Sequence, residues 1–187
     1  MNRYAALLVP AVIPLLIVGC TPRRDRARLL KDVETIAVRM ENLHTRVPDL
    51  LIRVPTRFVV EWTSEARYDK YFIYDPKDTA DVQKGMVMID VAPFPARQIP
   101  DTSDVSRSIG TIDGHDVIWR EYVVEDMEGP PLHQREMTSA EVFEEAERFV
   151  EEKRVLHAFV VGTDPELVEL LTGAVETITV LPRKPNL

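Results

Sequence analysis

The sequence predicts an α+β domain in which helices cover an antiparallel β-sheet and an amphipathic helix precedes it. Runs of β-branched and aromatic residues between turn signals recur from about residue 55 to residue 138, which is typical of antiparallel strands. Apolar residues at helical spacing lie before this region, at 29–47, and after it, at 139–153 and from 165 onward. The chain of 187 residues is 45% hydrophobic, enough for one domain with a substantial core.

The first predicted helix spans residues 29–47. Its apolar residues recur at alternating spacings of four and three and would share one face: Leu29, Val33, Ile36, Met40, Leu43 and Val47. Pro48 ends the helix, because proline blocks helical hydrogen bonding. A helix docked on its own domain and a helix that joins a partner or a second copy have the same pattern, so both alternatives stay open.

Strand-like sequence follows Pro48. The predicted strands cover residues 57–63, 68–74, 86–92, 109–112, 116–124, 132–137 and 155–161. The first two form a predicted hairpin, and residues 93–107, which contain three prolines, a long surface loop. Asp113 and Gly114 between two β-runs are the strongest hairpin signal in the chain.

Two further helices are predicted near the C-terminus. Thr138 and Glu141 form a capping box for a helix over about residues 139–153. Pro165 suits the first turn of another helix, which either stops at Gly173 or continues to Thr177. An extended stretch, 179–181, and a tail, 182–187, complete a domain that we place at residues 55–181.

The N-terminus resembles the signal peptide of a bacterial lipoprotein. Arg3 precedes the apolar run Ala5–Val18, which is too short to span a bilayer comfortably. The run closes on Ile17–Cys20, a lipobox. We therefore expect residues 1–19 to be a signal peptide cleaved after Gly19, and Cys20 to be lipidated.

Lipidation of Cys20 explains why the chain has one cysteine. A single cysteine excludes internal disulfides and paired-cysteine metal sites. The alternative to a lipidated Cys20 is a secreted protein with an unpaired thiol. Two or three acyl chains would anchor the protein permanently in a membrane on its extracytoplasmic side. By the same resemblance, Thr21 after the cysteine implies the periplasmic face of the outer membrane rather than the inner membrane, if the organism has both.

Charge is unevenly distributed along the chain. Residues 20–28 form a basic tether, and basic residues continue to Lys31. Such a segment is suited to anionic lipid headgroups, although a solvated helix start has the same composition. The net charge of the whole chain is −8, and an acidic domain excludes nucleic acid as the partner.

The sequence contains no motif whose residue spacing is specific for catalysis, cofactor binding or metal binding. His115 lies between Asp113 and Asp116, but turn geometry explains these residue types. The isolated histidines His44, His133 and His157 fit surface positions or satisfied core positions, and the acidic residues Asp75, Asp78 and Asp81 lack the calcium-loop pattern. We therefore predict no enzyme activity, no cofactor and no metal.

Two groups of residues are candidates for a partner surface. One is an aromatic group on the first predicted hairpin: Trp62, Tyr68, Tyr71 and Tyr74. The other is the acidic face of the helix at 139–153, with Glu141, Glu144 and Glu145. The competing interpretation of the aromatic group is that about half of its rings are buried in the core. The competing interpretation of the acidic group is a helix face that is simply solvated.

The order of elements over residues 55–181, with Trp119 on the second strand of the Asp113–Gly114 hairpin and a closing Thr177–Val180, is similar to the PsbP-like α/β sandwich. That fold occurs in photosystem extrinsic proteins, a nuclear import factor and small bacterial lipoproteins of unassigned role. The resemblance implies a binding or assembly module.

Together these features predict a membrane-anchored envelope lipoprotein that binds another envelope protein without catalysis. A small apolar ligand or lipid held between sheet and helices is the alternative, and a hydrolase working through His115 is a third possibility. Neither the identity of the partner nor the oligomeric state follows from the sequence.

Overall fold

The predicted fold class is wrong, because a second sheet takes the place expected for helices. The computed structural model describes residues 21–41, 48–65, 68–78, 84–92, 98–100, 102, 104–125, 129–139 and 155–182. Within these residues the chain forms two antiparallel sheets, one α-helix and one short 3₁₀-helix. The helix-covered sandwich implied by the PsbP-like resemblance is therefore not the observed architecture.

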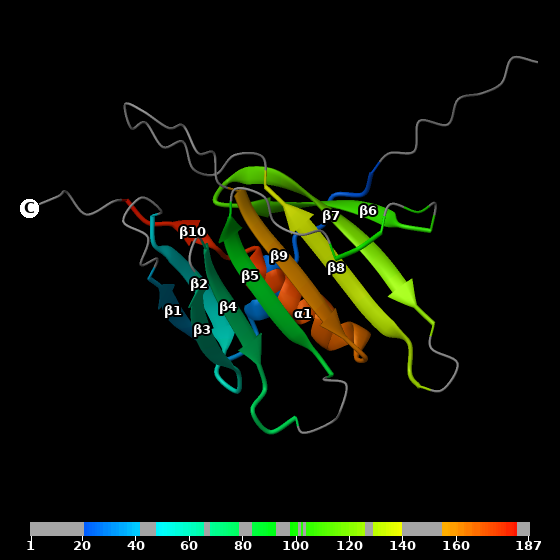
Figure 1. Cartoon of the computed structure of the whole chain (residues 1–187), viewed down its shortest axis with the longest axis horizontal. Coiled ribbons are helices and arrows are strands. Elements are labelled where there is room, and N and C mark those ends of the chain that lie inside the picture. The colour runs from blue at the N-terminus through cyan, green and yellow to red at the C-terminus, as the bar shows by residue number, and fades with distance from the viewer. Residues whose placement is uncertain are drawn as a thin grey trace, which may run out of the picture.

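The elements follow one another as η1 (Ala27–Leu30), β1 (Thr35–Met40), β2 (Leu50–Pro55), β3 (Val59–Glu65), β4 (Tyr68–Tyr74), β5 (Met86–Ala92), β6 (Ser106–Ile112), β7 (His115–Val124), β8 (Leu132–Thr138), β9 (Val155–Gly162), α1 (Pro165–Val175) and β10 (Thr179–Val180). Figure 1 labels them on the ribbon.

The larger sheet has seven strands in the order β3-β4-β5-β9-β8-β7-β6. It consists of two antiparallel meanders, β3-β4-β5 and β6-β7-β8, that are joined by β9. β9 pairs with β5 on one side and with β8 on the other, so a strand late in the sequence lies at the centre of the sheet (Figure 1).

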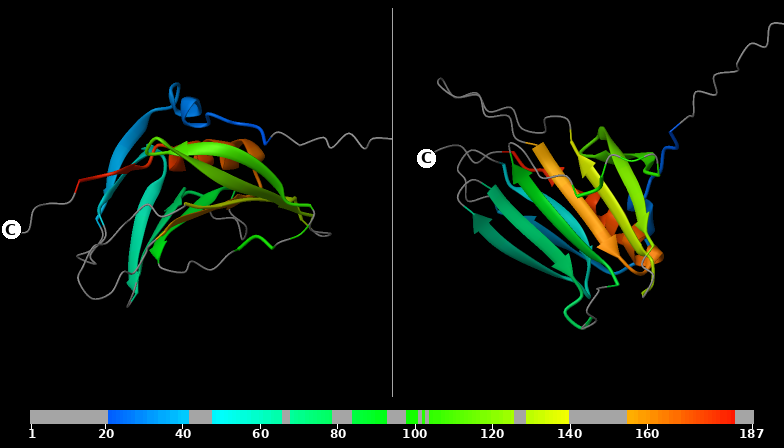
Figure 2. Two further views of the ribbon diagram at one scale, coloured as in Figure 1. Left: turned by 90° about the horizontal axis from the view of Figure 1, so that it is seen from above. Right: turned by 45° about the vertical axis from the view of Figure 1, so that its right-hand side comes forward.

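The second layer covers one face of this sheet. It contains the three-stranded sheet, ordered β1-β2-β10, and α1 beside it. Seen from above, α1 lies between the seven-stranded sheet and η1 (Figure 2). We call the face of the seven-stranded sheet that packs on α1 and β2 the inner face and the opposite face the outer face.

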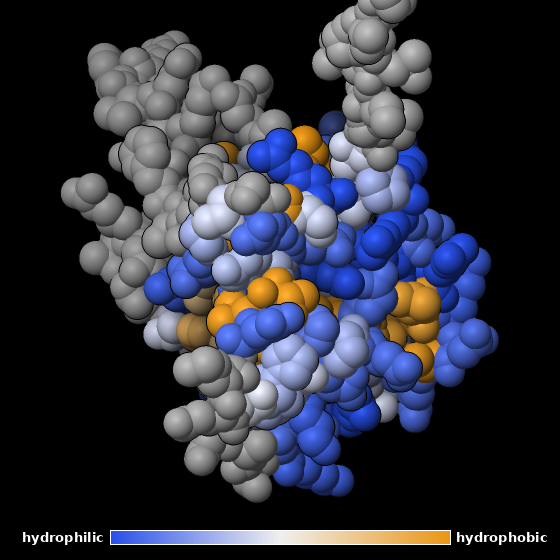
Figure 3. Space-filling view, turned by 90° about the vertical axis from the view of Figure 1, so that its right-hand side faces the viewer, coloured by the Kyte–Doolittle hydropathy of each residue, from blue (hydrophilic) through white to orange (hydrophobic). Residues whose placement is uncertain are grey.

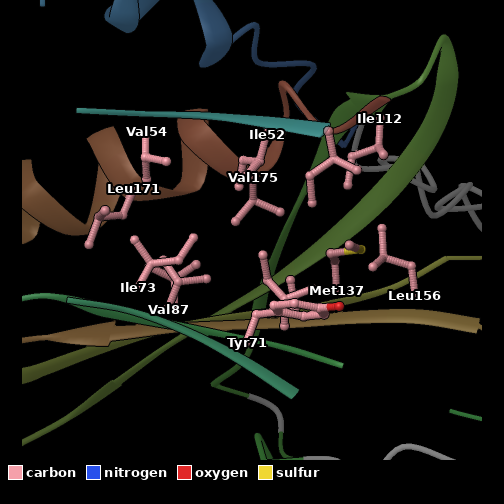
Figure 4. Packing of buried hydrophobic residues seen from close by; sticks show 14 of the residues in the cluster. Ile52, Val54, Tyr71, Ile73, Val87, Ile112, Met137, Leu156, Leu171 and Val175 are labelled. Atoms are coloured by element: carbon pink, nitrogen blue, oxygen red, sulfur yellow. The ribbon is translucent and has the colours of Figure 1, made fainter. Parts of the chain in front are cut away.

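The core fills the space between the two layers. Alternate residues of the strands point into it, including Ile52 of β2 and Ile73 of β4, and α1 contributes Leu171 and Val175. Figure 4 shows these side chains interdigitating between the helix and the larger sheet. Burial of apolar surface at about 25 cal/mol per Å² makes this layer contact the main source of stability.

The predicted N-terminal helix at 29–47 is wrong. Residues Ala27–Leu30 form the single turn η1, and Thr35–Met40 form β1, which pairs in antiparallel register with β2. Ile36, Val38 and Met40 also fit a period of two, and pairing with the apolar β2 satisfies the backbone groups of β1 that face it. Residues 42–47 lie outside the described part of the chain.

The strands predicted from residue 57 onward and the helix predicted at Pro165 agree with the structure, whereas β2 was not among the predicted strands. The β3-β4 hairpin is confirmed, and Asp113 and Gly114 form the β6-β7 turn with positive φ angles of 49° and 80°. α1 begins at Pro165, is capped by the Asp164 carboxylate and continues through Gly173 to Val175. The loop expected at 93–107 lies partly outside the described residues, and its end differs from the prediction because β6 begins at Ser106. The helix predicted at 139–153 lies outside the described residues except for Ser139.

Candidate functional site

The two edges of the seven-stranded sheet differ, and this difference defines the candidate site. The N-terminal segment covers the edge formed by β6. The Arg24 amide donates to the Ile109 carbonyl at 2.8 Å, and the Ile109 amide donates to the Pro22 carbonyl at 2.9 Å. Arg23 and Ile109 thereby form a parallel bridge, which shields this edge from pairing with another chain.

The buried guanidinium of Arg26 locks this segment in place. Arg26 is only 1% exposed and forms ion pairs with Glu121 at 2.7 Å, Glu169 at 3.1 Å and Glu176 at 3.2 Å. Its guanidinium also donates to the Ser108 hydroxyl at 2.8 Å. A buried charge is stable only when it is paired in this way, so Arg26 specifies where the N-terminal segment docks.

Two glycines make room for this cluster. A Cβ at Gly173 of α1 would lie 2.4 Å from the Arg26 carbonyl oxygen, and a Cβ at Gly110 of β6 would lie 2.2 Å from Oε1 of Glu176. Glycine inside a helix or strand often marks such a close approach. These two residues were the available sequence signal for the Arg26 cluster, which our sequence analysis missed.

Two carboxylates around Arg26, those of Glu176 and Glu121, have pKa values shifted in opposite directions. Burial raises the pKa of Glu176, although Arg26 and the Trp119 indole both hydrogen bond to it. Burial also acts to raise the pKa of Glu121, but the Ser108 hydroxyl and the nearby arginines outweigh it and lower that pKa. Burial lowers the pKa of Arg135, which contacts Glu121, to about 10. The cluster is a charge-balanced structural network.

A second buried network surrounds His157 on the outer face of the sheet. Nδ1 of His157 lies 3.3 Å from Oδ2 of Asp90, and Nε2 lies 3.0 Å from Oε1 of Glu136. Arg120 donates to Oε2 of Glu136 at 3.0 Å, and the Ile99 amide donates to the same oxygen at 3.3 Å. The network thereby attaches the loop at 98–100 to the sheet.

His157 is protonated in the neutral range. Its burial lowers the imidazole pKa, but the hydrogen bonds to Asp90 and Glu136 and their charges outweigh this effect and raise the pKa to about 9. The His157 contacts and the backbone hydrogen bonds from the loop overcome burial and lower the pKa of Glu136. With both ring nitrogens held by carboxylates and no exposed surface, His157 is a satisfied core histidine and cannot serve as a general base.

The other candidate residues for chemistry are dispersed. His115 is exposed beside the β6-β7 turn, and the neighbouring Asp116 carboxylate pairs with Arg23 at 2.8 Å. Asp75 and Asp78 accept hydrogen bonds from the amides of Lys77 and Lys84. In the described part of the chain, no three His, Cys, Asp or Glu side chains are arranged to hold a metal ion. His133 is half-buried, and His44 and Asp81 lie outside the described residues.

The predicted aromatic surface is divided by the structure. Tyr71 is 2% exposed, belongs to the core and donates its hydroxyl to the Glu41 carbonyl at 2.7 Å. Tyr74 is half-buried and bonds to Glu61. Trp62 is 44% exposed. The Tyr68 side chain and Glu141, Glu144 and Glu145 lie outside the described residues, so Trp62 is the described member of the set that presents a large apolar surface.

Trp62 lies on β3, the edge strand opposite β6. Among the described elements, only β4 pairs with β3. The indole Nε1 donates to Oδ1 of Asp69 at 3.3 Å, which fixes the ring, and Glu61 and Thr63 on either side are also exposed. On the side of β3 away from β4, this edge therefore combines backbone groups that pair with no described strand with an oriented aromatic ring.

Comparisons with known proteins assign no family. No family model matches the chain, and no curated protein matches it. A crystal structure of a protein from Bacteroides thetaiotaomicron VPI-5482 is similar over 71% of this chain, with 12% sequence identity and a TM-score of 0.42. The match covers 45% of that protein, so this chain spans less than half of its length. At this level of similarity, function has to be inferred from the site itself.

Proposed function

We propose that this protein is an envelope lipoprotein, anchored through Cys20, that binds another envelope protein by strand addition at β3. The observation that carries the proposal is the asymmetry of the large sheet. One edge is closed by residues 22–24, whereas among the described residues no strand other than β4 pairs with β3, which bears the exposed Trp62. In strand addition the backbone supplies affinity and neighbouring side chains supply specificity.

The properties of β3 support a protein partner. Natural proteins usually blunt exposed edges with charge, proline or a covering segment. β3 has Glu61 as an exposed charge, but Trp62 is among the residue types most enriched at binding hot spots. The indole is held by Asp69, so little side-chain entropy would be lost on binding.

The anchor is proposed from the lipobox at Ile17–Cys20. Within the described residues, no helix is both long and apolar enough to cross a membrane. Two or three acyl chains on Cys20 would supply membrane attachment independently of the fold.

A binding role without catalysis agrees with the buried networks. His157 has both nitrogens occupied, and the Arg26 cluster is closed by its own ion pairs. The space between the layers, where an apolar ligand was the alternative, is lined by side chains such as Ile73, Leu156 and Leu171, which are fully buried. We therefore favour a protein partner over an interior ligand.

Site-specific photocrosslinking in the host tests the strand-addition proposal. A photoreactive residue at Thr63 on β3 should give one defined heavy species, and the same residue at Ile36, on the edge of the other sheet, should not. Trp62→Ala should reduce the Thr63 crosslink at least tenfold, whereas Ile36→Ala should leave it unchanged. Equal crosslinking from both positions, or none from Thr63, would refute binding at this edge.

The anchor has its own test. Mass spectrometry of the purified protein should find a mature N-terminus at Cys20 carrying diacylglycerol. Cys20→Ser should prevent this modification and release the protein from the membrane fraction. An unmodified Cys20 in a protein that still sediments with membranes would exclude the proposed anchor.

A further inference from the structure

Very little chain separates the proposed anchor from the folded domain. The Pro22 carbonyl already accepts a hydrogen bond from the Ile109 amide, and Arg26 is buried four residues later. Cys20 lies two residues before Pro22, and an extended chain spans at most about 3.6 Å per residue. The acylated residue would therefore lie within about 7 Å of Pro22, which is hydrogen-bonded to β6, too close for the domain to move freely away from the bilayer.

We propose that the outer surface of the β6-β7 hairpin lies against the lipid headgroups in which the chain is anchored. This inference rests on the proposed lipidation of Cys20. The surface consists of Ile109 and Ile118, with Arg23 and Arg107 beside them. The occupant is the anionic surface of a phospholipid bilayer.

The two isoleucines form an apolar pair on the outer face. Ile109 of β6 and Ile118 of β7 are directly opposite each other in the register. Their neighbours Val117 and Trp119 point into the core, so alternation directs Ile109 and Ile118 away from it. Ile118 is 57% exposed, the highest value among the exposed large hydrophobic residues described. Exposed apolar residues rimmed by polar ones are typical of contact surfaces.

Basic side chains adjoin this pair. Arg107 is exposed and lies two residues before Ile109 on the same face of β6. Arg23, which bridges to Ile109, is exposed as well and shares its charge with Asp116. Lys and Arg side chains close to an anionic leaflet are attracted to its headgroups. Figure 3, which faces the β6-β7 side, shows hydrophobic patches within a mainly hydrophilic surface.

The docking of the N-terminal segment would fix the orientation of the domain. Arg24 pairs with Glu121 and Arg26 with three carboxylates, so the residues after the anchor cannot act as a free linker. β3 lies six strand spacings from β6, which is about 29 Å along the sheet at about 4.8 Å per strand. The edge proposed to bind a partner would then lie far from the anchored hairpin, at the opposite end of the sheet.

Fluorescence quenching in vesicles tests this orientation. Acylated full-length protein is reconstituted into phosphatidylethanolamine–phosphatidylglycerol vesicles that contain brominated lipids. An environment-sensitive fluorophore is placed on Ile118→Cys or, as the matched control, on Ile36→Cys, which is 47% exposed on the other sheet. The acylated Cys20 does not react with the label, so each variant carries one fluorophore. We expect quenching at position 118 to be at least twice that at position 36.

A linker variant and a charge variant complete the experiment. Insertion of four Gly-Ser residues between Thr21 and Pro22 should reduce quenching at position 118 toward the value at position 36, while the protein still floats with vesicles. Arg107→Glu should also reduce it, whereas Arg57→Glu should not. Equal quenching at both positions in a protein that floats would overturn the orientation and leave the anchor intact. A protein that does not float would overturn the anchor itself.

Discussion

At the scale of single residues, the structure depends on charges buried among their partners. His157 sits between Asp90 and Glu136, and Arg26 sits among three glutamates, each in a position that excludes water. A buried ion pair is not in itself strongly stabilising, but removing one partner leaves the other uncompensated. Both networks join segments distant in sequence, so they specify the fold as much as they stabilise it.

His157 makes stability depend on pH above neutrality. Its pKa is about 9 in the folded protein, against a usual value of 6.5, so the folded state binds the proton more tightly. This contribution is fully present below pH 6.5 and is lost as the pH rises through 9. We expect the free energy of unfolding from urea titrations to fall by about 3 kcal/mol over this range.

Two histidine variants serve as controls for this pH dependence. His157→Gln should be less stable than the wild type at pH 6.5, and its free energy of unfolding should change little between pH 6.5 and 9. His115→Gln, at an exposed turn, should show the same pH dependence as the wild type. NMR titration of the wild-type imidazole provides a direct measurement. A His157 pKa at or below 6.5 would contradict the assignment.

Arg26 and Arg23 provide a matched pair of arginines for a stability test. Arg26→Met leaves Glu176 buried without its cation and should cost about 3 to 5 kcal/mol. Arg23→Met removes an exposed pair with Asp116 and should cost less than about 1 kcal/mol. Adding Glu176→Gln to Arg26→Met should recover part of the loss in denaturant titrations. Similar costs for the two single variants would show that the Arg26 cluster is not a buried network.

The partners of individual residues could not be predicted from the sequence. Arg26 and Glu176 are 150 positions apart, and no local pattern relates them. His157 could be interpreted as either a surface or a satisfied core residue, and only the pairing of β9 with β5 and β8 brings Asp90 and Glu136 to it. Long-range partners follow from strand order, which periodicity does not encode.

At the scale of elements, local signals succeeded where backbone chemistry determines conformation. Asp113-Gly114 tolerates the positive φ angles of a tight hairpin, and Pro165 after Asp164 begins α1. The signal failed at β1, where spacings of four and three coexist with alternation of Ile36, Val38 and Met40. A segment this short fits both periods, and pairing with β2 determines the outcome.

Gly173 provides a test of how η1 packs on α1. In an exposed helix, Gly→Ala usually adds about 1 kcal/mol of stability. Here the new methyl group would meet the Arg26 carbonyl at 2.4 Å, so Gly173→Ala should instead lower the melting temperature by several degrees. It should also speed trypsin cleavage near Arg26 and Arg28. Glu166→Ala, at an exposed site on the same helix, is the control, and a stabilised Gly173→Ala protein would argue against this contact.

At the scale of the whole molecule, composition and strand content predicted one domain with an antiparallel sheet, but the prediction that helices cover this sheet was wrong. Helices were expected over the sheet, and the three-stranded sheet occupies part of that layer instead. Its strands come from opposite ends of the described chain, since β10 pairs with β2. The extended stretch predicted at 179–181 contains β10, but no local pattern shows that it pairs with β2, so the second sheet could not be foreseen.

The N-terminal segment should accordingly behave as part of the domain. A chain that begins at Leu29 lacks the β6 contact and the Arg26 cluster, whereas one that begins at Thr21 retains both. We expect the shorter chain to melt at least 5 °C lower and to aggregate more readily, as measured by calorimetry and light scattering. Equal melting temperatures would mean that the segment adds nothing to the fold.

The central position of β9 also bears on how the protein is made. Because the chain is synthesised N-terminus first, the sequences of both meanders are available before the strand that joins them. Until Val155–Gly162 is available, β5 and β8 each present an unpaired edge capable of recruiting neighbouring chains. Chains arrested before residue 155 should therefore need a chaperone that keeps the two half-sheets apart. A chain truncated before this residue would be prone to aggregation instead of forming a smaller folded domain.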